Sequence, residues 1–118
     1  LTSLTVLDVA SNNLSGTVPD GLASLPSLKF LYLTDNQFTT LPDMGKLPNL
    51  TGLFVNNNNL TGSLGDDMAA SHCVTGKDCY TDVCLDVSCN GGGVKVAPSV
   101  VEACKKSGVC KLTPQTCK

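Results

Sequence analysis

The residues with the most distinctive chemistry in this chain are its seven cysteines, which all lie in the C-terminal part of the sequence. The first 72 residues contain none. Cysteines grouped in this way form disulfides in an oxidising compartment or a metal site in a reducing one. Zinc sites typically combine C-x2-4-C pairs with further Cys or His ligands, whereas successive cysteines here are separated by 5, 4, 4, 14, 5 and 6 residues. The spacing therefore favours disulfides and predicts no metal site.

An odd number of cysteines leaves at least one of them unpaired. We predict at least two disulfides after residue 72, and because six cysteines can pair in 15 ways the sequence leaves the connectivity open. Disulfides in turn indicate an extracellular or cell-surface protein. The residues concerned are Cys73, Cys79, Cys84, Cys89, Cys104, Cys110 and Cys117.

Catalytic chemistry has little support in this sequence. The only histidine, His72, adjoins Cys73 and is poorly placed to activate its thiol. The chain has no G-x-S-x-G motif, no His-Glu pair at metal-binding spacing and no phosphate-binding glycine loop, the motifs that mark common classes of enzyme. We therefore predict that the protein is not an enzyme and needs no cofactor.

Charge and hydropathy argue against two further kinds of partner. The formal net charge is −2 and the 8 basic residues form no stripe, so nucleic acid is not expected as a partner. No apolar run approaches the roughly 20 residues that a membrane-spanning helix needs. Membrane attachment is therefore expected only through a segment outside this sequence.

Three Asn-x-Ser/Thr sequences predict sites of modification. Asn13, Asn49 and Asn59 each have Ser or Thr two residues later, which is the acceptor motif for N-linked glycosylation. Asn13 and Asn59 occupy the same position of an Asn-rich repeat, so chance is the alternative explanation for these two. We predict glycosylation, with Asn49 as the best candidate.

The elements that carry these residues follow a repeated pattern, L-x-x-L-x-L-x-x-N-x-L, with Val or Phe at some positions. Three copies begin at Leu4, Leu28 and Leu50, and a fainter fourth copy contains an insertion. The asparagines of the copies are spaced by 24, 22 and 32 residues and are Asn12, Asn36, Asn58 and Asn90. A period of this length predicts a solenoid, in which each repeat packs on the next.

Alternation within each copy predicts short parallel strands. Leu-x-Leu spacing puts two side chains on one face of a strand and the residue between them on the other. We therefore expect strands centred on residues 6–10, 30–34, 52–56 and 85–87, stacked in one sheet. Their leucines and valines form a continuous core, while each asparagine amide satisfies backbone groups where its strand turns away.

One motif ties this pattern to a known family. Residues 12–19 read NNLSGTVP and match N-x-L-x-G-x-[IV]-P, and residues 58–64 match most of it. Together with the repeats, this motif resembles the plant-type extracellular subclass of the leucine-rich-repeat family. The second copy departs from the motif, because residues 38–42 lack the L-x-G step and the copy is two residues shorter. Protist surface proteins with similar repeats and a cysteine-rich end fit equally well.

The resemblance implies an α/β solenoid, a right-handed superhelix with a short parallel sheet on its concave face and irregular or 3-10 segments on its convex face. We expect residues 1–65 to form about three repeats, and residues 66–118 a cysteine-rich C-terminal cap that contains the degenerate fourth repeat. Because the chain opens inside a repeat, we expect it to be the C-terminal part of a longer ectodomain.

A short helix is expected within the cap, between Pro98 and Gly108. Proline suits the first turn of a helix, two lysines lie where the last turn would be, and Gly108 can end it. Val101 and Cys104 share one face of this helix and are expected to pack against the last repeat.

The resemblance also implies that a protein, peptide or glycan is recognised on the concave face, with no shared catalytic residues. Alternation places three aromatic rings outward on that face, where exposed aromatic side chains are candidate binding anchors. The alternative is that the rings merely cover the strands. With polar neighbours at the rim, the predicted ligand-binding residues are Asp8, Phe30, Tyr32, Asp35, Phe54 and Asn56.

Three functions remain open at this point. The leading hypothesis is the binding ectodomain of a receptor-like or secreted recognition protein. A structural surface-coat or adhesion protein, with its repeats as spacers, is the second. An inhibitor of a secreted hydrolase is the third, as some plant-type repeat proteins are.

Overall fold

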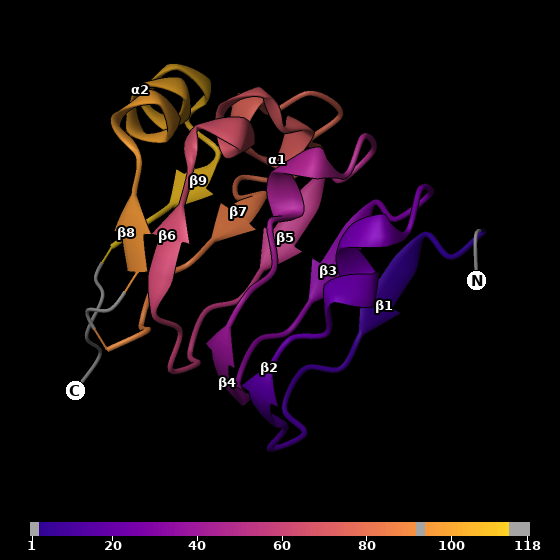
Figure 1. Cartoon of the computed structure of the whole chain (residues 1–118). Helices are drawn as coiled ribbons and strands as arrows, with labels where there is room; N and C mark the ends of the chain where they lie inside the picture. The colour runs from indigo at the N-terminus through magenta and orange to yellow at the C-terminus, as the bar shows by residue number, and fades with distance from the viewer. Residues whose placement is uncertain (1–2, 92–93, 114–118) are drawn as a thin grey trace.

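Short parallel strands stack into one sheet, as the repeat pattern predicts. The computed structural model describes residues 3–91 and 94–113. Within these ranges the main sheet has five strands in the order β1-β3-β5-β7-β9, and every neighbouring pair is parallel. Figure 1 shows the chain coiling from one strand to the next. The strands are β1 (Val6–Asp8), β3 (Phe30–Tyr32), β5 (Gly52–Phe54), β7 (Leu85–Asp86) and β9 (Cys110–Lys111).

The predicted solenoid is confirmed, and four of its strands lie where the pattern placed them. Leu7, Leu31, Leu53 and Leu85 stand in register across the sheet. The last three are fully buried, whereas Leu7 in β1 is only partly buried against the core. The fifth strand, β9, was not predicted. It pairs with β7 and extends the sheet beyond the fourth repeat.

The recurring asparagines join neighbouring repeats from within. Asn58 is buried, and its Nδ2 donates to the carbonyl of Leu33 at 2.9 Å and to that of Val55 at 3.1 Å. Its Oδ1 accepts the backbone N–H of Phe38 at 3.0 Å. Asn36 and Asn90 are buried and bonded in the same way. The predicted role is confirmed for these three asparagines, each of which satisfies buried backbone groups of two repeats at once. Asn12 of the first repeat differs, because it is exposed and its side-chain amide donates only to the carbonyls of Val9 and Ala10 in its own repeat.

The opposite side of each coil consists of short 3-10 helices, in agreement with the expected irregular convex segments. They are η1 (Asp20–Ser24), η2 (Met44–Lys46) and η3 (Asp66–Ala70). The Asp43 side chain caps η2 by accepting the N–H of Gly45 at 3.1 Å. A Cβ at Gly45 would lie 2.7 Å from the Cβ of Asp67, so η2 and η3 pack backbone to backbone.

Two further pairs of short strands form outside the main sheet. The strands β2 (Ser15–Thr17) and β4 (Gln37–Thr40) form one parallel pair, and β6 (Gly62–Leu64) and β8 (Val94–Val96) form the other. Of these strands, β2, β4 and β6 each precede a 3-10 helix along the chain. Gly16 and Gly62, the glycines of the two L-x-G steps, have φ of +83° and +96°, a conformation that favours glycine. The second repeat has Thr40 at that position, and its pairing with β2 is irregular there.

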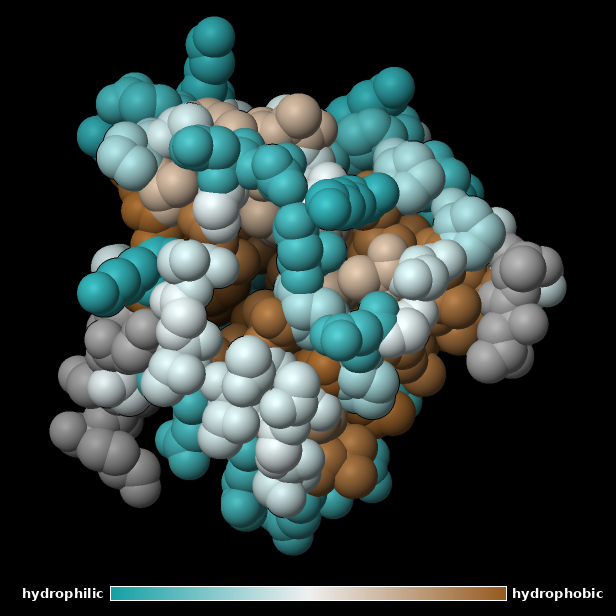
Figure 2. Space-filling model, viewed as in Figure 1, coloured by the Kyte–Doolittle hydropathy of each residue, from teal (hydrophilic) through white to brown (hydrophobic). Residues whose placement is uncertain are grey.

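The two strand pairs do not join, and a small hollow of about 70 Å³ separates them. Its lining includes Leu41 and Leu60 as well as threonines and glycine. Figure 2 shows apolar surface in a hollow in the middle of this face of the molecule. The break lies beside β4 of the second repeat, which is shorter and lacks the L-x-G step.

The C-terminal part contains two helices, α1 (His72–Thr75) and α2 (Pro98–Ser107), which pack against each other. The helix expected from Pro98 onward is confirmed, and Gly108 ends it with φ +74° and an N–H donated to the carbonyl of Cys104 at 2.8 Å. Its buried residues are Val100 and Cys104, four positions apart, whereas Val101 is half-buried. Of the two residues expected to pack against the last repeat, Cys104 is buried as expected, whereas Val100 rather than Val101 joins it in the core.

One hydrophobic cluster extends from Val18 in the first repeat to Cys104 in α2. The C-terminal segment thus shares its core with the repeats. Two disulfides, Cys79–Cys84 and Cys104–Cys110, confirm that at least two bridges tie this segment.

The remaining cysteines differ in state. Cys89 is disulfide-bonded as well, Cys73 is a buried free thiol, and Cys117 lies outside the described residues. Cys104–Cys110 links the end of α2 to β9. This bridge therefore helps to hold the unpredicted edge strand in place.

Candidate functional site: the concave face of the sheet

The structure brings three of the predicted ligand-binding side chains together on the exposed face of the five-stranded sheet, which we call the concave face. Phe30 and Tyr32 alternate with the buried Leu31 along β3, and Phe54 stands in register with Tyr32 on β5. All three rings are half-buried. We call Phe30, Tyr32 and Phe54 the aromatic array.

The rings of the aromatic array pack on one another. The centroids of Tyr32 and Phe54 are 5.0 Å apart with planes inclined by 6°, and those of Phe30 and Tyr32 are 6.4 Å apart and inclined by 13°. Such pairs stabilise by about 0.5–1.5 kcal/mol beyond the area that they bury. The rings are thus held in one arrangement before any ligand arrives, which lowers the entropy that binding must remove.

Gly52 allows the rings to fold down onto the sheet. It lies on β5 opposite Phe30, and a Cβ there would stand 2.7 Å from Cδ1 of Phe30 and 2.9 Å from Cε2 of Phe54. Any side chain at this position would push the two rings apart. The sequence placed Gly52 beside the array by register, but its role as the floor beneath the rings appears only in three dimensions.

The polar residues of the predicted site lie around the array. Asp8 is exposed on β1 in register with Tyr32, and its Oδ1 accepts the N–H of Ala10 at 3.0 Å. Asn56, just after β5, accepts a hydrogen bond from the Thr34 hydroxyl at 2.9 Å. These two side chains form a rim at the ends of the array.

Asp35 stands further off. It lies in the turn after β3 with φ +59°, is exposed, and accepts the Ser11 hydroxyl at 3.4 Å. The structure thus brings Asp8 and Asn56 to the array and sets Asp35 beyond the strand ends.

Charged residues flank Tyr32 and Phe54 in the register of the sheet. Asp8 on β1 lies opposite Tyr32, and Asp86 on β7 lies opposite Phe54. Lys111 on β9 is paired in turn with Asp86. Asp86 Oδ1 accepts both the N–H and the hydroxyl of Ser88, at 3.0 and 2.6 Å, as Asp8 accepts a backbone N–H in the first repeat. Sequence reasoning missed Lys111, because β9 carries no repeat pattern that would have revealed it.

The three predicted glycosylation sites are all exposed. Asn49 differs from the other two, because its Nδ2 donates to the carbonyl of Pro26 at 3.1 Å and Thr51, two residues later, is buried. Modification of Asn13, Asn49 and Asn59 remains a prediction.

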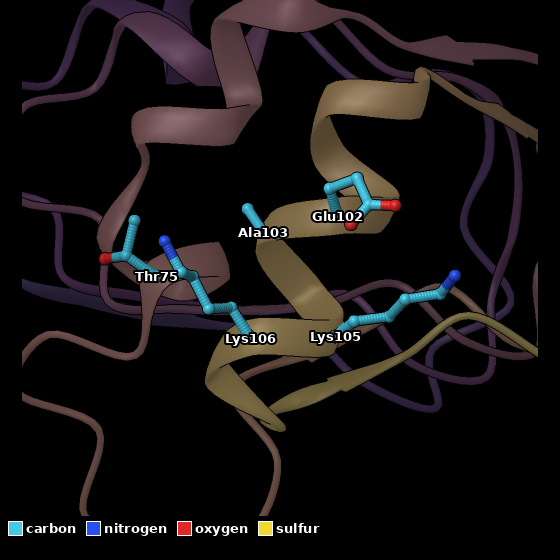
Figure 3. A pocket seen from close by; sticks show the side chains of 5 residues that line it. All are labelled: Thr75, Glu102, Ala103, Lys105 and Lys106. Carbon is cyan, nitrogen blue, oxygen red and sulfur yellow. The ribbon is translucent and has the colours of Figure 1, made fainter.

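A surface hollow of about 630 Å³ lies along α2 near α1. Its lining residues are Thr75, Glu102, Ala103, Lys105 and Lys106. Figure 3 shows Glu102 and Lys105 directed to one side of the helix and Lys106 to the other, near Thr75. Because the side chains diverge, this hollow presents no set of groups that could act together on one ligand.

The described residues contain no other cluster with evident reactivity. Residues 3–91 and 94–113 hold no group of three His, Cys, Asp or Glu side chains able to bind a metal ion. No helix within these ranges has the length and apolar character to cross a membrane. The free thiol of Cys73 is fully buried, and burial raises its pKa to about 11 despite a hydrogen-bond contact with Ser71 at 3.1 Å. At neutral pH it is therefore protonated and inert.

A stack of parallel strands with aromatic rings on its outward face defines the class of the protein, a repeat solenoid. The family model described as leucine-rich repeats (2 copies) matches residues 2–44 and 26–67. The chain belongs to the leucine-rich-repeat family.

Relatives of several kinds share these repeats. A probable leucine-rich-repeat receptor-like serine/threonine-protein kinase of Arabidopsis thaliana is 44% identical over 62 residues, which is 52% of this chain and 7% of that protein. Toll-like receptor 2 type-2 of Gallus gallus is 45% identical over 58 residues, 49% of this chain and 7% of the receptor. Podocan of Mus musculus is 42% identical over 62 residues, 51% of this chain and 10% of podocan.

The chain thus spans a tenth or less of the length of these relatives. The shared part consists of leucine-rich repeats, so the similarity to a kinase does not extend kinase activity to this chain. What the relatives support in common is a module of protein interaction.

Proposed function

We propose that this chain is an extracellular recognition module that binds a protein, peptide or glycan through the concave face of its sheet. The observation that carries the proposal is the aromatic array: Phe30, Tyr32 and Phe54 are stacked, half-buried and outward on short rigid strands. Aromatic side chains held in this way are the usual anchors of an interface. The rim of Asp8 and Asn56 adds groups that orient a ligand.

The extracellular setting is supported by two observations. Disulfides persist in oxidising compartments and are rare in the cytosol, and this chain holds Cys79–Cys84 and Cys104–Cys110. Receptor-like, Toll-like and podocan relatives carry the same repeats.

Residues 66–118 are proposed to close the solenoid. A stack of repeats needs a terminal segment with its own polar surface. Here β9 covers the edge of β7 and α2 packs on α1 and η3, with Val100 and Cys104 buried beneath it. The disulfides replace the part of a core that so few apolar residues cannot supply.

The test uses peptides as the probe. A displayed library of random dodecapeptides is selected on the immobilised chain, and the affinity of the best peptide is then measured for wild type and for Tyr32→Ala/Phe54→Ala. Loss of an anchor typically costs about 2 kcal/mol or more in binding, so the double variant should bind at least about 30-fold more weakly.

The matched control is Lys95→Ala, an exposed residue on β8 away from the main sheet. It should leave the affinity unchanged. Thermal unfolding of each variant guards against misfolding. Equal binding of wild type and the double variant would mean that the rings only cover the strands, as expected of a spacer or coat protein.

A further inference from the structure

A second hollow, of about 480 Å³, lies beside Phe30, where the insertion of the fourth repeat approaches the start of β3 and β5. We propose that this hollow, which we call the Tyr80 hollow, binds a saccharide ring. The inference rests on the proposed role of the concave face in recognition. It assigns a class of ligand, a saccharide, to the hollow at the edge of that face. The side chains that carry the argument are Lys29, Phe30, Asn49, His72, Asp78 and Tyr80.

The floor of the Tyr80 hollow is fixed by hydrogen bonds. The carbonyl of Lys29 accepts the N–H of Thr51 at 2.7 Å and that of Gly52 at 2.9 Å. The hydroxyl of Thr51, which is buried, donates to the carbonyl of Asn49 at 3.1 Å, and Asn49 Nδ2 reaches the carbonyl of Pro26. Phe30, Lys29 and Asn49 therefore have defined positions before a ligand binds.

The wall of the hollow is a loop that is closed on itself and tied to the sheet. The Cys79–Cys84 disulfide closes it, and the Thr81 hydroxyl donates to the carbonyl of Val83 at 2.9 Å within it. The carbonyl of Cys84 accepts the N–H of Leu53 in β5 at 2.9 Å. The loop is thus anchored next to the aromatic array.

Tyr80 stands on this loop with 90% of its surface exposed. A large ring that has no packing role, on a backbone that is held in place, has the properties of a contact residue: it offers much surface at a small entropic cost. Tyr80 and Phe30 both line the hollow and give it two aromatic rings.

The polar lining is mixed in charge. Lys29 and His72 bring donors, Asp78 brings acceptors, and the Asn49 amide has both kinds of group. A ligand with one strong charge would meet a side chain of its own sign. A sugar ring instead offers hydroxyls that donate and accept, as well as a face of C–H groups that can lie against Phe30 or Tyr80.

The geometry of the sheet argues against a peptide strand at this place. A peptide that adds to a sheet pairs with the free backbone groups of an edge. In the floor of the hollow, the N–H groups of Thr51 and Gly52 are already bonded to Lys29. The volume is also within the roughly 300–1,000 Å³ of small-molecule sites.

The saccharide has two potential sources, a free glycan or an N-linked glycan on Asn49 itself. Asn49 lines the hollow, so a sugar attached there would begin inside it. The chemistry that recognises the sugar is the same in both cases, and the host used for expression distinguishes them.

The experiment titrates the whole chain with neutral hexasaccharides of glucose, mannose, N-acetylglucosamine and galactose, and saturation-transfer NMR detects the binding. Chain secreted to the bacterial periplasm forms disulfides without glycosylation. We expect it to bind at least one of these saccharides, and Tyr80→Ala to weaken that binding by about tenfold or more. Tyr80→Phe should keep most of the affinity, and Lys95→Ala, an exposed residue on β8 that does not line the hollow, should leave it within about twofold.

A second arm compares chain from a glycosylating eukaryotic host with the unglycosylated chain from the bacterial periplasm. If only the unglycosylated chain binds free saccharide, the glycan of Asn49 occupies the hollow; if both bind, the ligand is a free glycan. Either result supports the proposal.

Two results would overturn it: no binding of any of the four saccharides, or binding that Tyr80→Ala leaves unchanged. In the second case the sugar binds elsewhere on the chain, and the proposed function survives. If peptides bind the array while no saccharide binds, this inference alone fails. Thermal unfolding checks that Tyr80→Ala is folded, as its exposure leads us to expect.

Discussion

Replacing Gly52 by alanine should displace the aromatic array while leaving the core of the solenoid intact. The added Cβ would stand 2.7 Å from Cδ1 of Phe30 and 2.9 Å from Cε2 of Phe54, whereas carbon atoms in contact are about 3.5–4.0 Å apart. Each ring must therefore move outward by roughly 1 Å. Both contacts are with ring atoms on the exposed face of the sheet, so the buried Leu53 beside Gly52 is not disturbed.

The effect on stability should be small. Alanine in place of glycine stabilises by about 0.4–1 kcal/mol, because the unfolded chain loses freedom. Disturbed stacking of the rings offsets this by about 0.5–1.5 kcal/mol. The net change in the free energy of unfolding is then within about 1 kcal/mol of zero, whereas binding depends on the ring positions and should weaken by at least about tenfold, or 1.4 kcal/mol.

The assay measures the affinity of a peptide selected on the wild-type chain, together with the near-ultraviolet circular dichroism of Tyr32 and the urea midpoint. Gly21→Ala is the matched control, because a Cβ there meets nothing within 4 Å; it should bind as wild type does. If Gly52→Ala binds the peptide as tightly as wild type, with an unchanged tyrosine signal, the rings do not rest on Gly52 and this reasoning is refuted.

Two further predictions concern the interior. Asn58→Ala leaves the carbonyls of Leu33 and Val55 and the N–H of Phe38 without their partner. In a urea titration it should lower the free energy of unfolding by about 3 kcal/mol or more. Asn12→Ala, at an exposed position of the same motif, is the control and should lower it by less than about 1 kcal/mol. Burial raises the pKa of the Cys73 thiol from 9.0 to about 11. Between these two values the thiol ionises in the unfolded chain but not in the folded one. The contribution of the buried thiol to stability is therefore complete below pH 9 and is lost as the pH rises toward 11. Relative to Cys73→Ala, wild type should lose about 2 kcal/mol of stability by pH 11, and parallel stability curves for the two proteins would contradict this.

The repeat pattern predicted the fold well because each repeat forms its structure from its own residues and its neighbours. Positions of Leu31, Leu53 and Leu85 in the sequence were sufficient to place strands and core. The edge strand β9 was missed because it lacks that pattern. It is defined by backbone hydrogen bonds, such as the N–H of Cys84 to the carbonyl of Val109 at 2.8 Å, which a sequence does not display.

The candidate site was predicted only in part, for a related reason. Alternation shows that Tyr32 and Phe54 point outward, but not that their rings stack at 5.0 Å or that Gly52 makes room beneath them. Tyr80 could not be placed at all. It belongs to an insertion without periodicity, and its position depends on the Cys79–Cys84 pairing, one of several that the sequence allowed.

Alternation along each strand also separates the residues that hold the fold from those that are free to bind. Inward positions such as Leu53, and the Asn58 amide at the strand end, bear on stability because burial and unsatisfied hydrogen bonds act there. Outward positions such as Tyr32 lie on strands that are already fixed from behind, so a substitution there removes ring stacking of about 0.5–1.5 kcal/mol per pair and leaves the core intact. A face of this kind can change its ligand by substitution at outward positions while the solenoid persists. Variants of Asn58 and of Tyr32 should accordingly fall into two classes, one that changes unfolding and one that changes binding.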